Sequence, residues 1–169
     1  MTITEICNIL RNELYNTGYE YGFVANGKRY QPDMSNGFDN AYYQSSLTIY
    51  RVQDPAVTRA EKLGTCVETV VLIQQLLDEL HVPCKLWLLH NKTKNKVHAI
   101  PTFEAEGKVV YLELTPQSAK PWYGKELVYN NEQDFLQEYQ KTGYDVSDVT
   151  NRVIIGEQPI FLLEKLENK

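Results

Sequence analysis

The stretch from Thr65 to Leu80 constrains the fold most, because it predicts a helix that is apolar on almost every side. Thr65 and Glu68 have the S/T-x-x-E spacing of a capping box, so Thr65 is expected to be the N-cap and Cys66 the first helical residue. The polar strip of the helix consists of Gln74, Gln75, Asp78 and Glu79. A helix with so little polar surface is mostly buried, so other elements must pack around it.

Three short runs with strand character follow this helix, at residues 85–90, 97–103 and 109–114. Turn-forming stretches separate them, so they predict an antiparallel meander. The rest of the chain predicts four further features, which are a helix at 3–15, a hairpin turn at Asn26-Gly27, a helix at 132–140 and a last strand at 159–163. The expected fold class is α+β, with the cysteine helix packed on an antiparallel sheet.

Length and charge limit the possible functions. A chain of 169 residues is expected to bury roughly 70% of its unfolded surface, and no repeat or linker divides it, so residues 1–169 are predicted to form one domain. A net charge of -5 and a pI near 5.2 give no basic surface for nucleic acid or an anionic membrane. No stretch has the features of a signal peptide or a membrane span, so a cytoplasmic location is expected.

The three cysteines, Cys7, Cys66 and Cys84, form no C-x-x-C pair, and one must stay unpaired in any scheme. Free thiols in a reducing compartment are therefore expected. Three histidines are scattered along the chain without the spacing of metal ligands. We therefore expect neither a metal ion nor another cofactor.

The position of Cys66 favours a reactive thiol. Unpaired N–H groups and the positive end of the helix dipole favour the thiolate, which is the nucleophilic form. The alternative is a buried cysteine that acts only as a small hydrophobe. A nucleophilic thiol needs a base, and of the three histidines only His98 falls inside a predicted strand, where a rigid backbone fixes the ring.

Glu113 is the candidate for the group that orients His98. By the two-residue alternation of a strand it shares one face with Val109, Tyr111 and Thr115. Taken singly, His98 fits a satisfied sheet histidine better than a base, and Glu113 fits an exposed residue or half of a surface ion pair better than an orienting group.

A glycine-x-cysteine at a helix start, a histidine in one strand and an acid in the next together resemble the transglutaminase-like superfamily of papain-like folds. The resemblance covers roughly residues 54–117, and the matching stretches are Asp54-Pro55-Ala56, Gly64-Thr65-Cys66, His81-Val82-Pro83, Val97-His98-Ala99 and Tyr111-Leu112-Glu113-Leu114-Thr115-Pro116. It implies a papain-like core in which Cys66 is the nucleophile, His98 the base and then the acid, and Glu113 the orienting group. The implied reaction is acyl transfer from a peptide or amide substrate through a thioester, ending in hydrolysis or transamidation.

The chain departs from the family pattern at the acid. Where members have Leu-Asp-Pro, this chain has Leu114-Thr115-Pro116, and Glu113 stands one position before it. Glu113 and Thr115 are therefore both candidates. We expect Glu113, because a carboxylate stabilises an imidazolium, whereas a hydroxyl only fixes the tautomer.

Two hairpin turns are possible before this acid. A loop at Ala105-Glu106 would put His98 opposite Glu113, and a loop at Glu106-Gly107 would put it opposite Thr115. Gly107 favours the second turn, because glycine adopts a positive φ without strain.

The sequence does not decide two features of the site, the second oxyanion donor and the lining of the cleft. The N–H of Cys66 is a natural oxyanion donor, but the second donor is open among Gln44, Tyr50 and Gln53. Trp122 and Tyr123 are candidates either for lining the cleft or for packing.

Two other functions remain to be weighed. A catalytically inactive binding module with the same fold is favoured by the Thr115 substitution. An arylamine N-acetyltransferase shares the Cys-His-acid order, but that family has Arg-Gly-Gly before the cysteine and this chain has Glu61-Lys62-Leu63.

Overall fold

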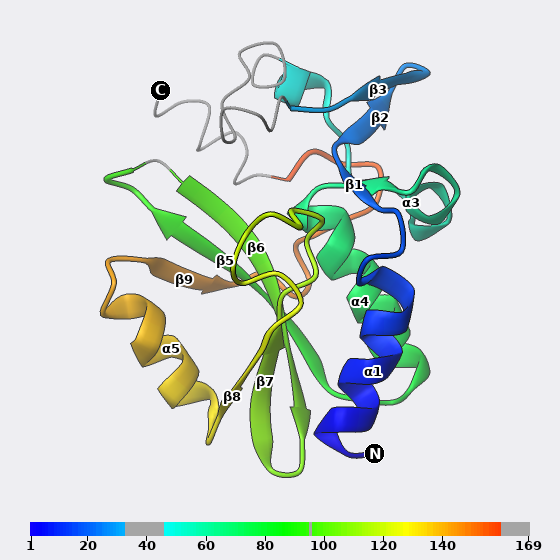
Figure 1. Cartoon of the computed structure of the whole chain (residues 1–169). Helices are drawn as coiled ribbons and strands as arrows, with labels where there is room; N and C mark the ends of the chain where they lie inside the picture. The colour runs from blue at the N-terminus through cyan, green and yellow to red at the C-terminus, as the bar shows by residue number, and fades with distance from the viewer. Residues whose placement is uncertain (33–45, 95, 160–169) are drawn as a thin grey trace.

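A five-stranded antiparallel sheet with the order β8-β7-β6-β5-β9 forms the centre of the fold (Figure 1). The computed structural model describes residues 1–32, 46–94 and 96–159. The strands of this sheet are β5 (Cys84–Asn91), β6 (Lys96–Ala105), β7 (Lys108–Leu112), β8 (Glu126–Tyr129) and β9 (Asp145–Asp148). Two smaller pairings lie outside it, the parallel pair of β1 (Glu20–Tyr21) with β4 (Leu63–Gly64) and the hairpin of β2 (Phe23–Ala25) with β3 (Lys28–Tyr30).

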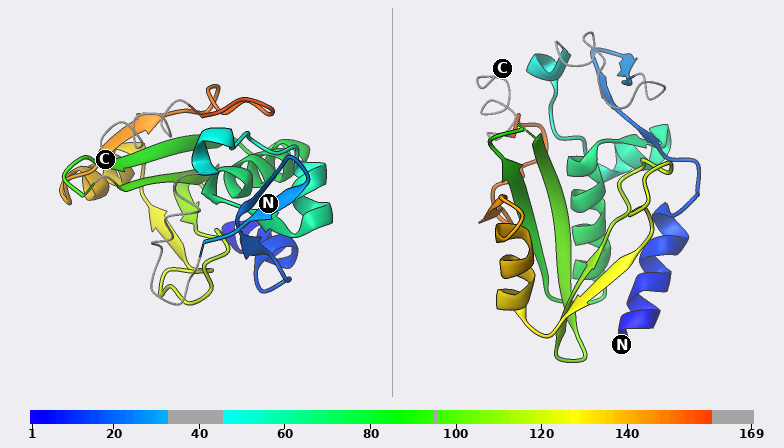
Figure 2. Two further views of the ribbon diagram at one scale, coloured as in Figure 1. Left: turned by 90° about the horizontal axis from the view of Figure 1, so that it is seen from above. Right: turned by 60° about the vertical axis from the view of Figure 1, so that its left-hand side comes forward.

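Helices cover both faces of the sheet (Figures 1 and 2). The helices of the described residues are α1 (Ile3–Leu14), α3 (Pro55–Glu61), α4 (Cys66–Glu79) and α5 (Glu132–Gln140), and a 3-10 turn, η1, lies at Leu47–Ile49. One face packs on α4 and α1, and the other on α5. No helix in the described ranges has the length and apolarity needed to cross a membrane.

The apolar faces of α4 explain this layering. Its first turns pack Val67 and Val70 against Leu86 and Ala99 of the sheet. Its later turns are shared between the sheet and α1, through the cluster Ile6, Leu10, Leu72, Ile73, Leu77, Phe103 and Val110. The helix is therefore enclosed over most of its length, as its sequence predicted, and Cys66 is held at its fixed N-terminal end.

The expected α+β class, the cysteine helix, the 85–114 meander, the hairpin turn at Asn26-Gly27 and the helices near both ends of the chain are confirmed. The structure adds α3, β8 and β9, which were not expected. β7 is shorter than predicted and ends at Leu112. The strand predicted at 159–163 lies, except for its first residue, outside the described residues.

The β6–β7 hairpin turns at Glu106-Gly107, since Ala105 pairs with Lys108. Both loop residues have positive φ, 54° for Glu106 and 71° for Gly107, as a two-residue hairpin turn requires. The second of the two expected turns is therefore the right one. Continued along the strands, the register places Thr115 rather than Glu113 across from His98.

Candidate active site

Cys66 is the first residue of α4, and the predicted capping box is present. The Thr65 hydroxyl accepts the Val67 N–H at 3.1 Å, and the Glu68 carboxylate accepts the Thr65 N–H at 2.8 Å. Gly64 is required before this cap, because a Cβ there would lie 2.8 Å from the Cβ of Glu68. The N–H groups of the first turn have no acceptor within the helix, so the Cys66 N–H remains available for a ligand.

Glu68, in the first turn of α4, is a buried carboxylate with 1% of its surface exposed. Besides the Thr65 N–H, it accepts hydrogen bonds from the Tyr50 hydroxyl and, at 3.2 Å, from the Gln53 N–H. Burial raises the pKa of Glu68, although the bonds from Tyr50, Thr65 and Gln53 act in the opposite direction. These bonds tie the preceding chain to the start of α4 and fix the position of Cys66.

The His98 ring lies between Cys66 and Glu113. It comes from β6, where His98 pairs with Leu89 of β5. The ring Nε2 contacts Glu113 Oε1, and the Cys66 side chain lies close enough to the ring to be one of the causes that raise the pKa of His98. The side chain of His98 is 30% exposed and that of Glu113 only 3%, so the histidine faces solvent while the acid behind it is buried.

The electrostatics of this contact are those of an ion pair. Burial disfavours the charge on His98, but the Glu113 carboxylate and the hydrogen bonds to Cys66 and Glu113 hold the pKa of His98 well above its ordinary value. Burial also disfavours the charge on Glu113, but His98 and the bonds from Tyr111 and Thr115 hold the pKa of Glu113 below its ordinary value. Each of the two groups therefore stabilises the charged form of the other.

Glu113 reaches the ring although the register favours Thr115. The β6–β7 ladder stops at the Thr102–Tyr111 pair, and Glu113 follows the end of β7. Thr115 contributes its N–H, which donates to Glu113 Oε2 at 3.0 Å. The Thr115 hydroxyl is buried and has no hydrogen-bond partner among the described residues. Thr115 thus supports the acid instead of replacing it.

The segment between β7 and β8 lies beside the N-terminal end of α4 (Figures 1 and 2). Its main chain holds Glu113, whose C=O accepts the Gly124 N–H at 2.7 Å. The Arg11 guanidinium of α1 in turn donates to the Gly124 C=O at 3.0 Å. Gly124 has a φ of +77°, and a Cβ there would meet the Tyr15 ring at 2.2 Å, so only glycine fits this contact.

Trp122 and Tyr123, from the same segment, have different surroundings. The Trp122 ring is 6.0 Å from the His98 ring between centroids and is partly exposed. The Tyr123 ring packs on Tyr15 at 5.0 Å, and its hydroxyl accepts the Asn16 N–H. Only Trp122 is therefore placed beside the candidate site.

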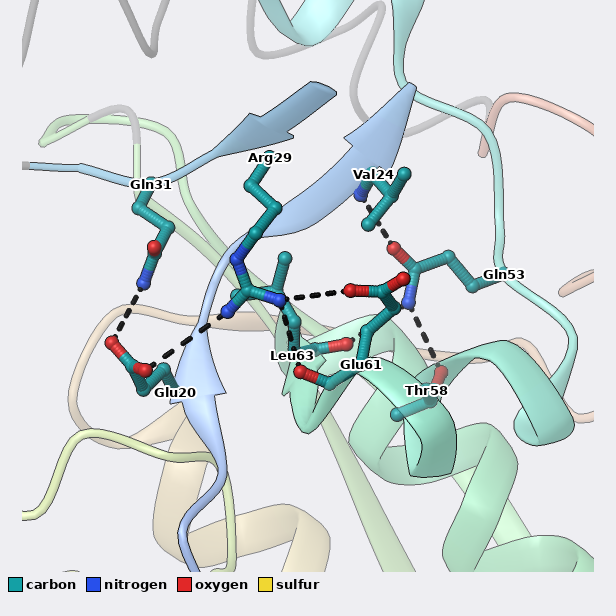
Figure 3. A network of polar contacts seen from close by, with 8 residues as sticks. All are labelled: Glu20, Val24, Arg29, Gln31, Gln53, Thr58, Glu61 and Leu63. Carbon is teal, nitrogen blue, oxygen red and sulfur yellow. Dashed lines mark hydrogen bonds and ion pairs between the residues drawn. The ribbon is translucent and has the colours of Figure 1, made fainter. Parts of the chain in front are cut away.

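Two of the three candidates for a second oxyanion donor are already engaged. The Gln53 amide accepts from Val24 N and donates to Thr58 Oγ1 at 3.1 Å and Leu63 O at 3.0 Å (Figure 3). The Tyr50 hydroxyl donates to Glu68. Gln44 lies outside the described residues.

The other two cysteines have different environments. Burial, with the nearby Glu126, raises the pKa of Cys7 to about 12, and burial, with Asp78, raises that of Cys84 to about 12. All three cysteines are free. Across the described ranges no group of three or more His, Cys, Asp or Glu side chains is placed to hold a metal ion.

Sequence reasoning missed the supporting groups. The sequence analysis places Tyr111 on the same strand face as Glu113 but does not predict the hydrogen bond between them. It does not predict the Tyr50–Glu68 hydrogen bond either. The strand alternation that puts Tyr111 and Glu113 on one face is the sequence signal for their contact, whereas no sequence spacing predicts the contact of Tyr50 with Glu68.

Comparisons of the chain with family models, with curated proteins and with solved structures found no match.

Proposed function

We propose that this chain catalyses cysteine-dependent acyl transfer, with Cys66, His98 and Glu113 as the catalytic triad of a papain-like or transglutaminase-like core. The observation that carries the proposal is the His98 ring in contact with the buried Glu113 carboxylate and near enough to the Cys66 side chain to interact with it. The capped helix packed on an antiparallel sheet supports it, because that arrangement fixes the nucleophile relative to the base.

In the first half-reaction His98 takes the thiol proton, and the Cys66 sulfur attacks the carbonyl carbon of a carboxamide or peptide. A C–S bond forms while the carbonyl oxygen becomes an oxyanion, which the Cys66 N–H stabilises. The C–N bond then breaks, and the imidazolium gives its proton to the leaving amine. The product is a thioester on Cys66.

In the second half-reaction His98 removes a proton from water or from an acceptor amine. The new nucleophile attacks the thioester carbonyl, the C–S bond breaks, and the sulfur recovers its electron pair as thiolate. Throughout, Glu113 keeps the ring in one orientation and balances the charge of the imidazolium. The 30% exposure of His98 leaves the ring accessible to the second nucleophile.

The direct test uses p-nitrophenyl acetate as the acyl donor. We expect the wild-type chain to release p-nitrophenol and to carry an acetyl group on Cys66, located by peptide mass spectrometry. The Cys66→Ala variant should do neither above the uncatalysed rate, and the Cys84→Ser variant should behave as wild type. Acetylation of lysines alone, or equal rates in Cys66→Ala and wild type, would favour the inactive binding module.

Thiol reactivity gives a second prediction. Under native conditions iodoacetamide should alkylate Cys66 faster than Cys7 or Cys84, because Cys66 lies at a helix N-terminus beside an imidazolium, whereas burial keeps the other two protonated. Quantitative mass spectrometry of the three peptides over time measures the order. The advantage of Cys66 should shrink in His98→Ala, and labelling of Cys84 before Cys66 would contradict the assignment.

A further inference from the structure

Tyr111 lies behind the Glu113 carboxylate, outside the Cys66–His98–Glu113 triad. Its hydroxyl donates to Glu113 Oε1 at 2.5 Å. This is the same oxygen that contacts His98 Nε2. The other oxygen, Oε2, accepts the Thr115 N–H at 3.0 Å. Each carboxylate oxygen thus has a donor other than His98, so the carboxylate cannot rotate without breaking a hydrogen bond.

The Tyr111 ring is itself held by packing. Only 8% of its surface is exposed, and it belongs to the cluster on the face of the sheet that α5 covers, with Trp87 and Phe135. Its ring lies 6.4 Å from that of Tyr139 on α5. A buried tyrosine hydroxyl needs a polar partner, and here that partner is the triad acid.

Glu113 needs such support because of its position in the hairpin. The register puts Thr115, not Glu113, across from His98, and Glu113 follows the end of the β7 ladder. A glutamate side chain has three rotatable bonds, so one that reaches its partner from an offset position loses more freedom than a residue directly opposite would. Two fixed donors remove the alternative orientations before substrate binds.

Resting on the proposed function, we infer that Tyr111 is a positioning residue whose hydroxyl holds the Glu113 oxygen that faces His98 and keeps this carboxylate ionised and directed at the ring. It does not touch the thiol or the reacting carbonyl.

The titratable groups that act on this contact come from several elements. They are His98 from β6, Cys66 next to it from α4, Tyr129 from β8 and Tyr139 from α5. Burial and the Glu113 charge raise the pKa of Tyr111 well above its ordinary value, so the phenol stays a donor. After burial and His98, the hydrogen bond from Tyr111 is among the causes that set the lowered pKa of Glu113.

The test is the Tyr111→Phe variant, which keeps the ring and removes the hydroxyl. Loss of the donor favours the protonated form of Glu113, so the carboxylate loses its charge at a higher pH and the imidazolium loses its counter-charge with it. We expect the acid limb of the pH profile for Cys66 alkylation to move upward by about one pH unit, which is about a tenfold slower rate on that limb.

Tyr19→Phe is the matched control. It removes the same hydroxyl from a tyrosine that lies just before β1, and that hydroxyl is buried and has no hydrogen-bond partner among the described residues. Its alkylation profile should keep the wild-type midpoint. Carbon NMR of glutamate labelled at the side-chain carboxyl should show the Glu113 midpoint raised in Tyr111→Phe and unchanged in Tyr19→Phe.

Failure of this inference differs from failure of the proposed function. One outcome is that Cys66 is alkylated selectively in wild type while Tyr111→Phe changes neither the midpoint of the alkylation pH profile nor that of the Glu113 titration. In that case Tyr111 contributes only packing and the inference is wrong. If wild-type Cys66 shows no selective alkylation, the triad itself is wrong. Should Tyr111→Phe not fold, the wild-type Tyr111 hydroxyl proton provides the test, since its NMR signal must shift as Glu113 titrates; a signal that does not follow Glu113 overturns the inference.

Discussion

Replacing Glu113 with Gln is expected to slow acyl transfer at Cys66 on the order of 100- to 10,000-fold, the range seen when the acid of a triad becomes an amide. The Gln amide nitrogen can take the place of the oxygen that faces His98 Nε2. The ring would then have to accept at Nε2 and carry its proton on Nδ1, the nitrogen left to receive the thiol proton. The base is lost, and with it the charge that stabilises imidazolium. Rates of p-nitrophenol release at saturating donor measure the effect.

Thr115→Val is the comparison variant, because it removes the neighbouring hydroxyl and leaves the carboxylate in place. Circular dichroism must show that Glu113→Gln keeps the fold, since a carboxylate with only 3% of its side chain exposed also contributes to packing. A Glu113→Gln variant within threefold of the wild-type rate would remove Glu113 from the triad, and a larger loss in Thr115→Val would give its place to Thr115.

Replacing Glu68 with Ala is expected to lower the free energy of unfolding by about 2–4 kcal/mol. The change removes the capping box at the start of α4, which is worth about 1 kcal/mol. It also removes the carboxylate that accepts from two buried donors, the Tyr50 hydroxyl and the Gln53 N–H. Relief of the buried charge offsets part of the loss, because burial itself disfavours the ionised Glu68. Urea unfolding followed by fluorescence measures the difference.

Glu79→Ala is the matched control for this variant, since Glu79 is an exposed glutamate at the other end of the same helix. Its free energy of unfolding should stay within about 0.5 kcal/mol of wild type. Equal effects of the two variants would mean that the helix start is held by packing alone. Alkylation of Cys66 should also slow in Glu68→Ala and not in Glu79→Ala, because only the first loosens the N-terminal turn.

Local signals in the sequence predicted the core of the fold. Capping chemistry at Thr65 and Glu68, apolar periodicity in α4 and glycine at the Glu106-Gly107 turn each act within a few residues, and each prediction is confirmed. The helix α3 was missed although Asp54-Pro55 carries the N-cap and first-position proline of a helix start.

The elements that sequence could not give depend on distant partners. β8 and β9 pair with β7 and β5, and their runs of four residues have no clear alternation in burial. Two facts are needed to predict whether Glu113 or Thr115 contacts His98. They are the position of the β6–β7 turn and the residue at which the pairing of these two strands ends. The turn alone pointed to Thr115. Glu113 contacts His98 because β7 ends at Leu112, so the chain after Leu112 no longer follows the register of the β6–β7 pairing.

The hydrogen bonds from α1 through Gly124 to Glu113 couple the stability of the first helix to the proposed triad. Arg11 holds the Gly124 carbonyl, and the Gly124 amide holds the Glu113 carbonyl. Terminal helices open more often than central strands, and such local unfolding has its own free energy. Each opening of α1 breaks the Arg11–Gly124 hydrogen bond and leaves the Gly124–Glu113 contact without that support. The hydrogen-exchange stability of residues 3–14, far from Cys66 in sequence, is therefore expected to contribute to the order of Glu113.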